Sequence, residues 1–110
     1  MPDHQGHIRY TAEMRKRTSD AMQGFYALSM GAGADGALDR KTKELIALAI
    51  GTTQRCDGCI GFHTKALHDL GATRQEIAEV AATGAYMCGG PALMYAADTL
   101  RAWDQFSEVT

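Results

Sequence analysis

Apolar residues recur along this chain at the three- and four-residue spacing of amphipathic helices. The pattern predicts a first helix from Thr11, which is a suitable N-cap, to about Met30. The glycine-rich stretch from Gly31 to Gly36 then predicts a loop. No segment shows the strict alternation of a half-buried strand, so the pattern predicts an all-α fold.

Two more helices are predicted in the middle of the chain. Asp39 is a suitable N-cap for the first of them, which carries a broad apolar face over Leu45–Ile50 and is expected to end or loosen at Gly51. The next is expected to begin near Cys56 and to run to Leu70.

The last third of the chain predicts two further helices. Thr73 and Glu76 form the T-x-x-E pattern of a capping box, which marks a helix start. Gly89-Gly90 breaks that helix, and Pro91 suits the first turn of another whose apolar stripe includes Trp103. We therefore expect about five to six helices in all.

Composition limits the kind of protein. A chain of 110 residues fits a single domain, residues 1–110, in which 1–10 are expected to form a mobile N-terminal segment. The net charge is -2 and no basic cluster is present, so a nucleic-acid partner is not expected. No apolar run can span a membrane and no signal-peptide pattern opens the chain, so a cytoplasmic location is expected.

Three cysteines, Cys56, Cys59 and Cys88, make an odd count that does not suit a secreted disulfide framework. In a reducing compartment, a C-x-x-C pair is more often redox-active or metal-binding than structural. Cys88 is expected to be a small buried apolar residue.

The informative segment is Cys56-x-x-Cys59-x-x-x-His63, which follows Glu44 on the preceding helix. Spacings of three and four place Cys56, Cys59 and His63 along one helix face. The unpaired N–H groups and the dipole at a helix start stabilise an anion, so a thiol there loses its proton more readily. Whether Glu44 reaches the pair depends on packing.

This pattern favours a dithiol mechanism. One thiolate attacks a peroxide oxygen or a disulfide sulfur, and the second cysteine resolves the product while His63 shuttles a proton. The order is open at this point, because the helix start favours Cys56 as the nucleophile and the nearby imidazole favours Cys59. A zinc site, with His68 or Glu44 as a fourth ligand, is the main rival.

The residues Lys43-Glu44-Leu45, C-x-x-C-x-x-x-H and Leu70-Gly71-Ala72-Thr73 together resemble the AhpD-like alkylhydroperoxidases of the carboxymuconolactone decarboxylase family. The resemblance covers roughly Leu38 to Trp103. It implies a helical fold, assembly into a homotrimer or homohexamer, and reduction of hydroperoxides by electrons from a dihydrolipoyl protein. No cofactor or metal is implied.

The resemblance also implies roles for individual residues. Cys59 matches the peroxidatic cysteine, Cys56 its resolving partner, and His63 and Glu44 members of a proton relay. The better-known family enzyme has a histidine directly before the second cysteine, where this chain has Gly58. The leading hypothesis is an antioxidant thiol peroxidase or thiol–disulfide oxidoreductase; the alternatives are a lactone decarboxylase and a zinc-binding or interaction module without turnover.

Overall fold

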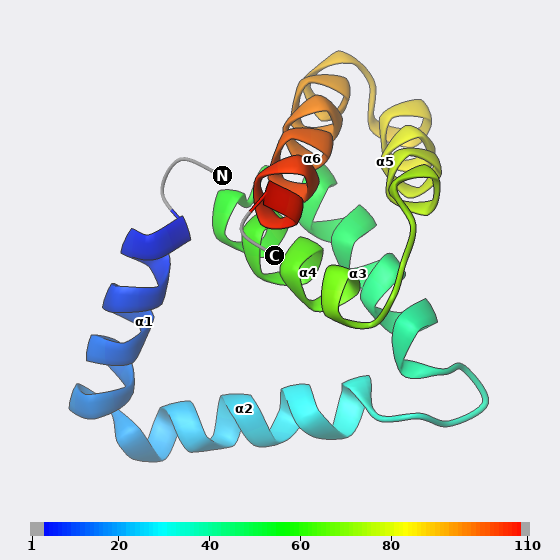
Figure 1. The fold of residues 1–110 in the computed structure, drawn as a ribbon. Helices are drawn as coiled ribbons and strands as arrows, with labels where there is room; N and C mark the ends of the chain where they lie inside the picture. Colours follow the sequence, from blue (N-terminus) through cyan, green and yellow to red (C-terminus); the bar gives the residue numbers. More distant parts are fainter. Residues whose placement is uncertain (1–3, 109–110) are drawn as a thin grey trace.

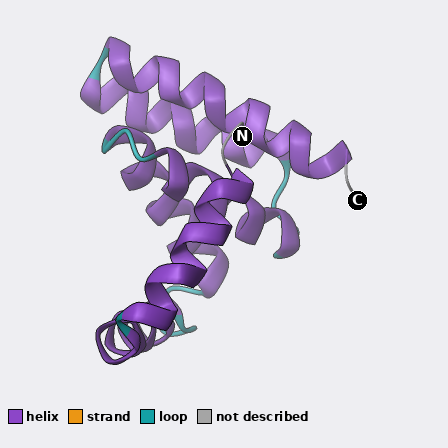
Figure 2. Ribbon diagram, turned by 90° about the vertical axis from the view of Figure 1, so that its left-hand side faces the viewer, coloured by secondary structure: helices purple, strands orange, loops and turns teal. Residues whose placement is uncertain are grey.

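The computed structural model describes residues 4–108, which form six helices and no strand (Figure 1, Figure 2). The predicted all-α fold is therefore confirmed. The helices, in chain order, are α1 (His4–Arg17), α2 (Ser19–Gly33), α3 (Arg40–Thr53), α4 (Asp57–Asp69), α5 (Arg74–Cys88) and α6 (Gly90–Glu108).

The helices divide into a packed body and a projecting arm. Helices α3 to α6 form the body, in which α5 packs along α6 and α3 contacts both α4 and α5. Helices α1 and α2 form an L-shaped arm that extends away from the body (Figure 1). No residue of α1 or α2 is buried, so the arm contributes little to the hydrophobic core.

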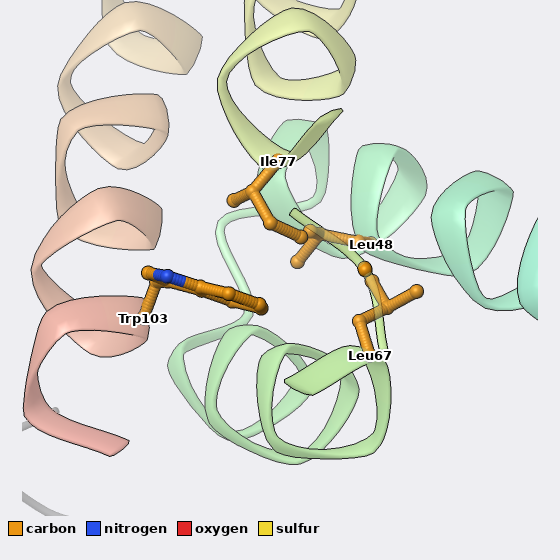
Figure 3. Close-up of a cluster of buried hydrophobic side chains, with 5 residues drawn as sticks. Leu48, Leu67, Ile77 and Trp103 are labelled. Atoms are coloured by element: carbon orange, nitrogen blue, oxygen red, sulfur yellow. The ribbon is translucent and has the colours of Figure 1, made fainter. Parts of the chain in front are cut away.

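One cluster of the core takes a large apolar side chain from each body helix. Leu48 of α3, Leu67 of α4, Ile77 of α5 and Trp103 of α6 meet in one cluster (Figure 3). Burial of each such side chain stabilises the fold by about 1.5–3 kcal/mol. Trp103, which the sequence places in the apolar stripe of the last helix, is 9% exposed and lies in this cluster.

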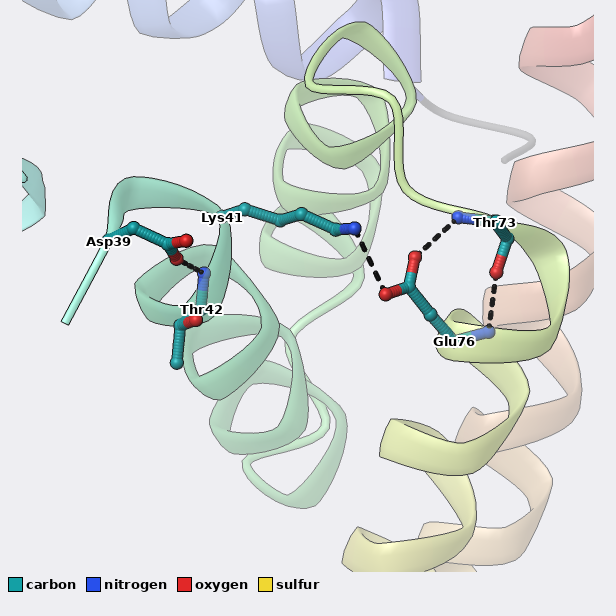
Figure 4. Close-up of polar contacts among 5 residues, drawn as sticks. All are labelled: Asp39, Lys41, Thr42, Thr73 and Glu76. Atoms are coloured by element: carbon teal, nitrogen blue, oxygen red, sulfur yellow. Dashed lines mark hydrogen bonds and ion pairs between the residues drawn. The ribbon is translucent and has the colours of Figure 1, made fainter.

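Side-chain caps start α3 and α5 where the sequence predicts them (Figure 4). The Thr42 N–H donates to Asp39 Oδ1 over 2.7 Å, and Thr73 and Glu76 form the reciprocal capping box. These hydrogen bonds lower the pKa of both carboxyl groups, chiefly through Thr42 for Asp39 and through the Thr73 backbone for Glu76. An ion pair of 3.0 Å between Lys41 Nζ and Glu76 Oε2 joins the two helix starts.

The N-terminal half differs from the prediction of a single helix that begins at Thr11. Helix α1 already begins at His4, and the Thr11 hydroxyl donates to the His7 carbonyl within it. The helix then breaks at Thr18, whose hydroxyl donates to the Met14 carbonyl over 2.8 Å. A threonine that bonds back to its own helix in this way favours a bend, and no glycine or proline marks the position.

Three further boundaries differ in smaller ways. Gly31 and Gly33 lie in the last turn of α2 and not in the loop, and Gly51 lies inside α3. Of the segment expected to be mobile, residues 4–10 are helical and residues 1–3 lie outside the described residues; its mobility is not tested. No helix within residues 4–108 is long and apolar enough to cross a membrane.

Candidate active site

The site begins at the tight turn that joins α3 to α4. The Cys56 N–H donates to the Gly51 carbonyl over 3.0 Å, and the Arg55 N–H donates to the Thr52 carbonyl over 3.2 Å. These two bonds are the Schellman motif that satisfies carbonyls at a helix end. The motif puts Arg55 at φ 58°, a left-handed conformation that is costly for a residue with a Cβ atom.

The turn delivers Cys56 to the start of α4 as its N-cap. Cys56 Sγ accepts a hydrogen bond of 3.1 Å from the Cys59 N–H, so the sulfur takes the place of a capping oxygen. The two cysteines form a disulfide with a Cα–Cα distance of 5.2 Å. Both are partly buried, which keeps the pair at the protein surface.

Helix α3 passes very close to this pair. A Cβ atom built on Gly51 would lie only 2.8 Å from the Cβ atom of Cys59. Real side chains do not approach so closely, so only glycine at this position allows α3 and α4 to pack at the observed distance. The sequence shows a glycine inside a helical pattern, but not that it faces a cysteine.

On the face of α4 that carries Cys59, an imidazole of α4 contacts a carboxylate of α3. Glu44 Oε2 lies 2.7 Å from His63 Nδ1, although 19 residues separate them in the chain. The Glu44 side chain is 19% exposed and that of His63 is 33% exposed. A carboxylate acceptor holds the proton on Nδ1 and leaves Nε2 as the nitrogen that can accept a proton.

The four residues that the sequence singles out therefore come from two adjacent helices. Cys59 and His63 are one turn apart on α4, Cys56 caps that helix, and Glu44 reaches across from α3. The sequence left open whether Glu44 reaches the cysteine pair, and the structure shows that Glu44 reaches His63. Such a group can form and resolve a sulfur–oxygen bond and can move a proton.

The model of the carboxymuconolactone decarboxylase family matches residues 19–102. The chain belongs to this family. The match includes α2 to α5 and most of α6, so it contains both cysteines, Glu44 and His63.

Two curated proteins share much of their sequence with this chain. An uncharacterized protein of Cupriavidus necator is 42% identical over 84 residues, which are 76% of this chain and 74% of that protein. Uncharacterized protein 4 in the cox locus of Paracoccus denitrificans is 41% identical over 81 residues, which are 74% of this chain and 73% of that protein.

Solved structures of family members share the fold. A carboxymuconolactone decarboxylase family protein from Legionella pneumophila is 47% identical, with a TM-score of 0.91 over 94% of this chain and 93% of that one. A family protein from Thermotoga maritima is 25% identical, with a TM-score of 0.83 over 94% of this chain and 91% of that one. An involvement in the antioxidative response has been suggested for the Thermotoga protein.

A hollow of about 310 Å³ lies beside Glu44. It lies between the end of α2 and the start of α3, and Met30, Asp35 and Arg40 line it together with Glu44. Small molecules from solvent can therefore approach this carboxylate from the side of the arm.

His68 does not join the site. Its Nε2 atom lies 3.1 Å from Ser107 Oγ, and its ring packs on Trp103 with 4.6 Å between the centroids. Among the described residues, no three His, Cys, Asp or Glu side chains are placed to hold a metal ion. The geometry thus gives the zinc alternative no ligand set.

Cys88 corrects one expectation. It is exposed and free at the end of α5, whereas the sequence analysis places it in the core. The adjoining Tyr86 and Met87 are also exposed.

Proposed function

We propose that this chain is a thiol peroxidase, which reduces hydroperoxides with the Cys56–Cys59 dithiol. The observation that carries the proposal is the Glu44–His63 contact on the helix face of Cys59. A carboxylate–imidazole pair beside a thiol is an arrangement that activates a nucleophile. Family membership and the suggested antioxidative involvement of the Thermotoga protein give independent support.

The cycle starts from the reduced dithiol. His63 takes the proton of the Cys59 thiol, and the thiolate attacks the terminal oxygen of a hydroperoxide, ROOH. The O–O bond breaks, Cys59 becomes a sulfenic acid, and the leaving alkoxide takes the proton from His63 to give the alcohol. The Cys56 thiol then attacks the Cys59 sulfur, which forms the disulfide and releases water.

A dithiol donor closes the cycle. Its first thiolate attacks the disulfide, its second thiol resolves the mixed disulfide, and the donor leaves oxidised while Cys56 and Cys59 regain their protons. We propose a lipoyl-type protein as the physiological donor and the cytoplasm as the compartment. The same chemistry with a disulfide as substrate would make the chain a thiol–disulfide oxidoreductase.

Glu44 sets the direction of proton transfer. Its acceptance of the Nδ1–H bond of His63 orients the ring and stabilises the imidazolium formed when the thiol is deprotonated. Assignment of Cys59 as the nucleophile follows from its place one turn from His63. Cys56 then resolves, since its sulfur already contacts the Cys59 backbone.

The test measures hydroperoxide consumption with a synthetic dithiol donor. Cys59→Ser should lower turnover to background. Cys88→Ser is the matched control, because it removes an exposed free thiol outside the site, and it should leave turnover unchanged. Equal turnover in the wild type and Cys59→Ser would overturn the proposal.

Two parallel measurements test the two alternative functions. Decarboxylation of a lactone substrate that persists when both Cys56 and Cys59 are serine would favour the lyase activity in the family name. One zinc per chain in protein purified without chelator, with both thiols unreactive, would favour a metal-binding or interaction module.

We also propose that the chain works as a homotrimer or homohexamer. The arm exposes Leu28 and Met30, which are 68% and 77% accessible, and the body exposes Leu93 and Met94. Apolar area of this kind is typical of surfaces that another subunit covers. Light scattering at working concentration should give a mass of three or six subunits, and a monomer would refute the assembly.

A further inference from the structure

A second imidazole lies at the start of α4, and the proposed cycle does not use it. A Cβ atom built on Gly58 would lie 3.5 Å from Cδ2 and 3.7 Å from Nε2 of His7. Gly58 stands between Cys56 and Cys59 in the chain. The edge of the His7 ring is therefore in van der Waals reach of the backbone that joins the two cysteines.

Helix α1 is held in this position by a second contact. The ring of His4 packs edge-on against Phe62 and Phe106, with centroid distances of 5.2 and 5.0 Å. Burial is the largest of the causes that lower the pKa of His4, which disfavours the charged form of this anchor. His7 meets Gly58 and His4 meets Phe62, so the first turn of α1 lies against the first half of α4.

The residues of α4 that contact α1 lie next to the residues that carry the reacting groups. Gly58 and Phe62 are four residues apart on α4, and Cys59 and His63 each follow one residue later. One residue turns a helix by about 100°, so α1 and His7 flank Cys59 on the side away from His63. Around the helix, Cys59 thus lies between the residues that contact α1 and His63, and its Cβ atom faces Gly51 of α3.

The surroundings of His7 decide which of its nitrogens carries the proton. Nδ1 is buried and has no hydrogen-bond partner among residues 4–108. A proton on Nδ1 would bury a donor without an acceptor, which is costly. The neutral ring with its proton on Nε2 leaves an unpaired acceptor at Nδ1 instead of an unpaired donor, and it places the N–H on the nitrogen near Gly58.

We propose that Nε2–H of His7 donates a hydrogen bond to the Cys59 thiolate once the disulfide is reduced. Reduction frees the Cys59 side chain to leave the Cys56 sulfur and to adopt the rotamer that points toward α1. His7 keeps its proton throughout, while His63 carries the proton of the cycle. The inference rests on the proposed dithiol function and adds a residue of the arm to its active site.

The experiment measures the thiolate itself, without peroxide. In a Cys56→Ser, Cys88→Ser background, Cys59 is the single thiol, and serine preserves the N-cap. The rate of alkylation by iodoacetamide is followed against pH, and the midpoint of the curve reports thiol ionisation. The other charged or titratable groups near α4 stay the same in both His7 variants: His4, Glu44, Arg55, Asp57, His63 and Lys65.

Three variants separate hydrogen bonding from packing. His7→Leu should raise the midpoint by about one pH unit, the size expected for one lost hydrogen bond to an anion. His7→Gln keeps an N–H near the position of Nε2 and should restore the parental midpoint. His4→Leu keeps an apolar side chain against Phe62 and Phe106, so α1 should stay docked and the midpoint should not change.

Three results would overturn the inference: an unchanged midpoint in His7→Leu, no rescue by His7→Gln, or an equal rise in His4→Leu. The last result would mean that docking of α1 matters and the Nε2–H bond does not. Because no peroxide is present, these results are independent of turnover. A wild-type protein that consumes no hydroperoxide would defeat the proposed function without changing the alkylation curves.

Discussion

The close approach of α3 and α4 at Gly51 makes a quantitative prediction for Gly51→Ala. On an ordinary helix, replacing glycine with alanine stabilises by about 1 kcal/mol. Here the new Cβ atom would lie 2.8 Å from the Cys59 Cβ atom, well inside the usual carbon–carbon separation of about 3.5–4.0 Å. The obstacle is a Cβ atom fixed to the backbone, so the helices themselves must move apart.

Overpacking of this kind typically costs about 1–3 kcal/mol. Because the obstacle is fixed to the backbone, we take the upper part of this range, about 2–3 kcal/mol. The gain in helix propensity offsets about 1 kcal/mol of it and leaves a net loss of about 1–2 kcal/mol. For a domain of this size, each 1 kcal/mol of that loss lowers Tm by about 4–8 °C. Movement at Cys59 should also lower peroxidase turnover.

Thermal unfolding at one fixed subunit concentration measures the effect, because assembly would make Tm depend on concentration. Gly24→Ala is the matched control, since nothing lies within 4 Å of a Cβ atom there. Its Tm should be equal to or above that of the wild type. A Gly51→Ala protein as stable as the Gly24→Ala protein would refute the packing argument.

Three further substitutions test other features. Arg55→Gly should stabilise by about 0.5–1 kcal/mol in urea unfolding, because glycine accepts the left-handed φ without penalty; a loss of stability would contradict this. Thr64→Val should stabilise by about 1 kcal/mol, since its buried hydroxyl has no partner in the described chain, whereas Thr52→Val, which loses a bond to the Leu48 carbonyl, should not. Glu44→Gln should lower peroxide turnover about tenfold or more, and unchanged turnover would exclude its role in the relay.

Sequence alone determined the features that depend on neighbours within one helical turn. The Asp39 cap, the capping box of Thr73 and Glu76, and the place of the C-x-x-C pair at a helix start all follow from hydrogen bonds that span three residues. The spacing of Cys59 and His63 along one face follows from helix geometry. Local physics of this kind can be read directly from the chain, and so can the all-α class.

Only the tertiary structure decided which helices meet and how closely. The Glu44–His63 contact spans 19 residues, and the approach of His7 to Gly58 spans more than twice as many. Such contacts depend on the packing of whole helices, which periodicity does not specify. The exposure of Cys88 has the same cause, because the burial of a residue at a helix end depends on which neighbouring helices reach it.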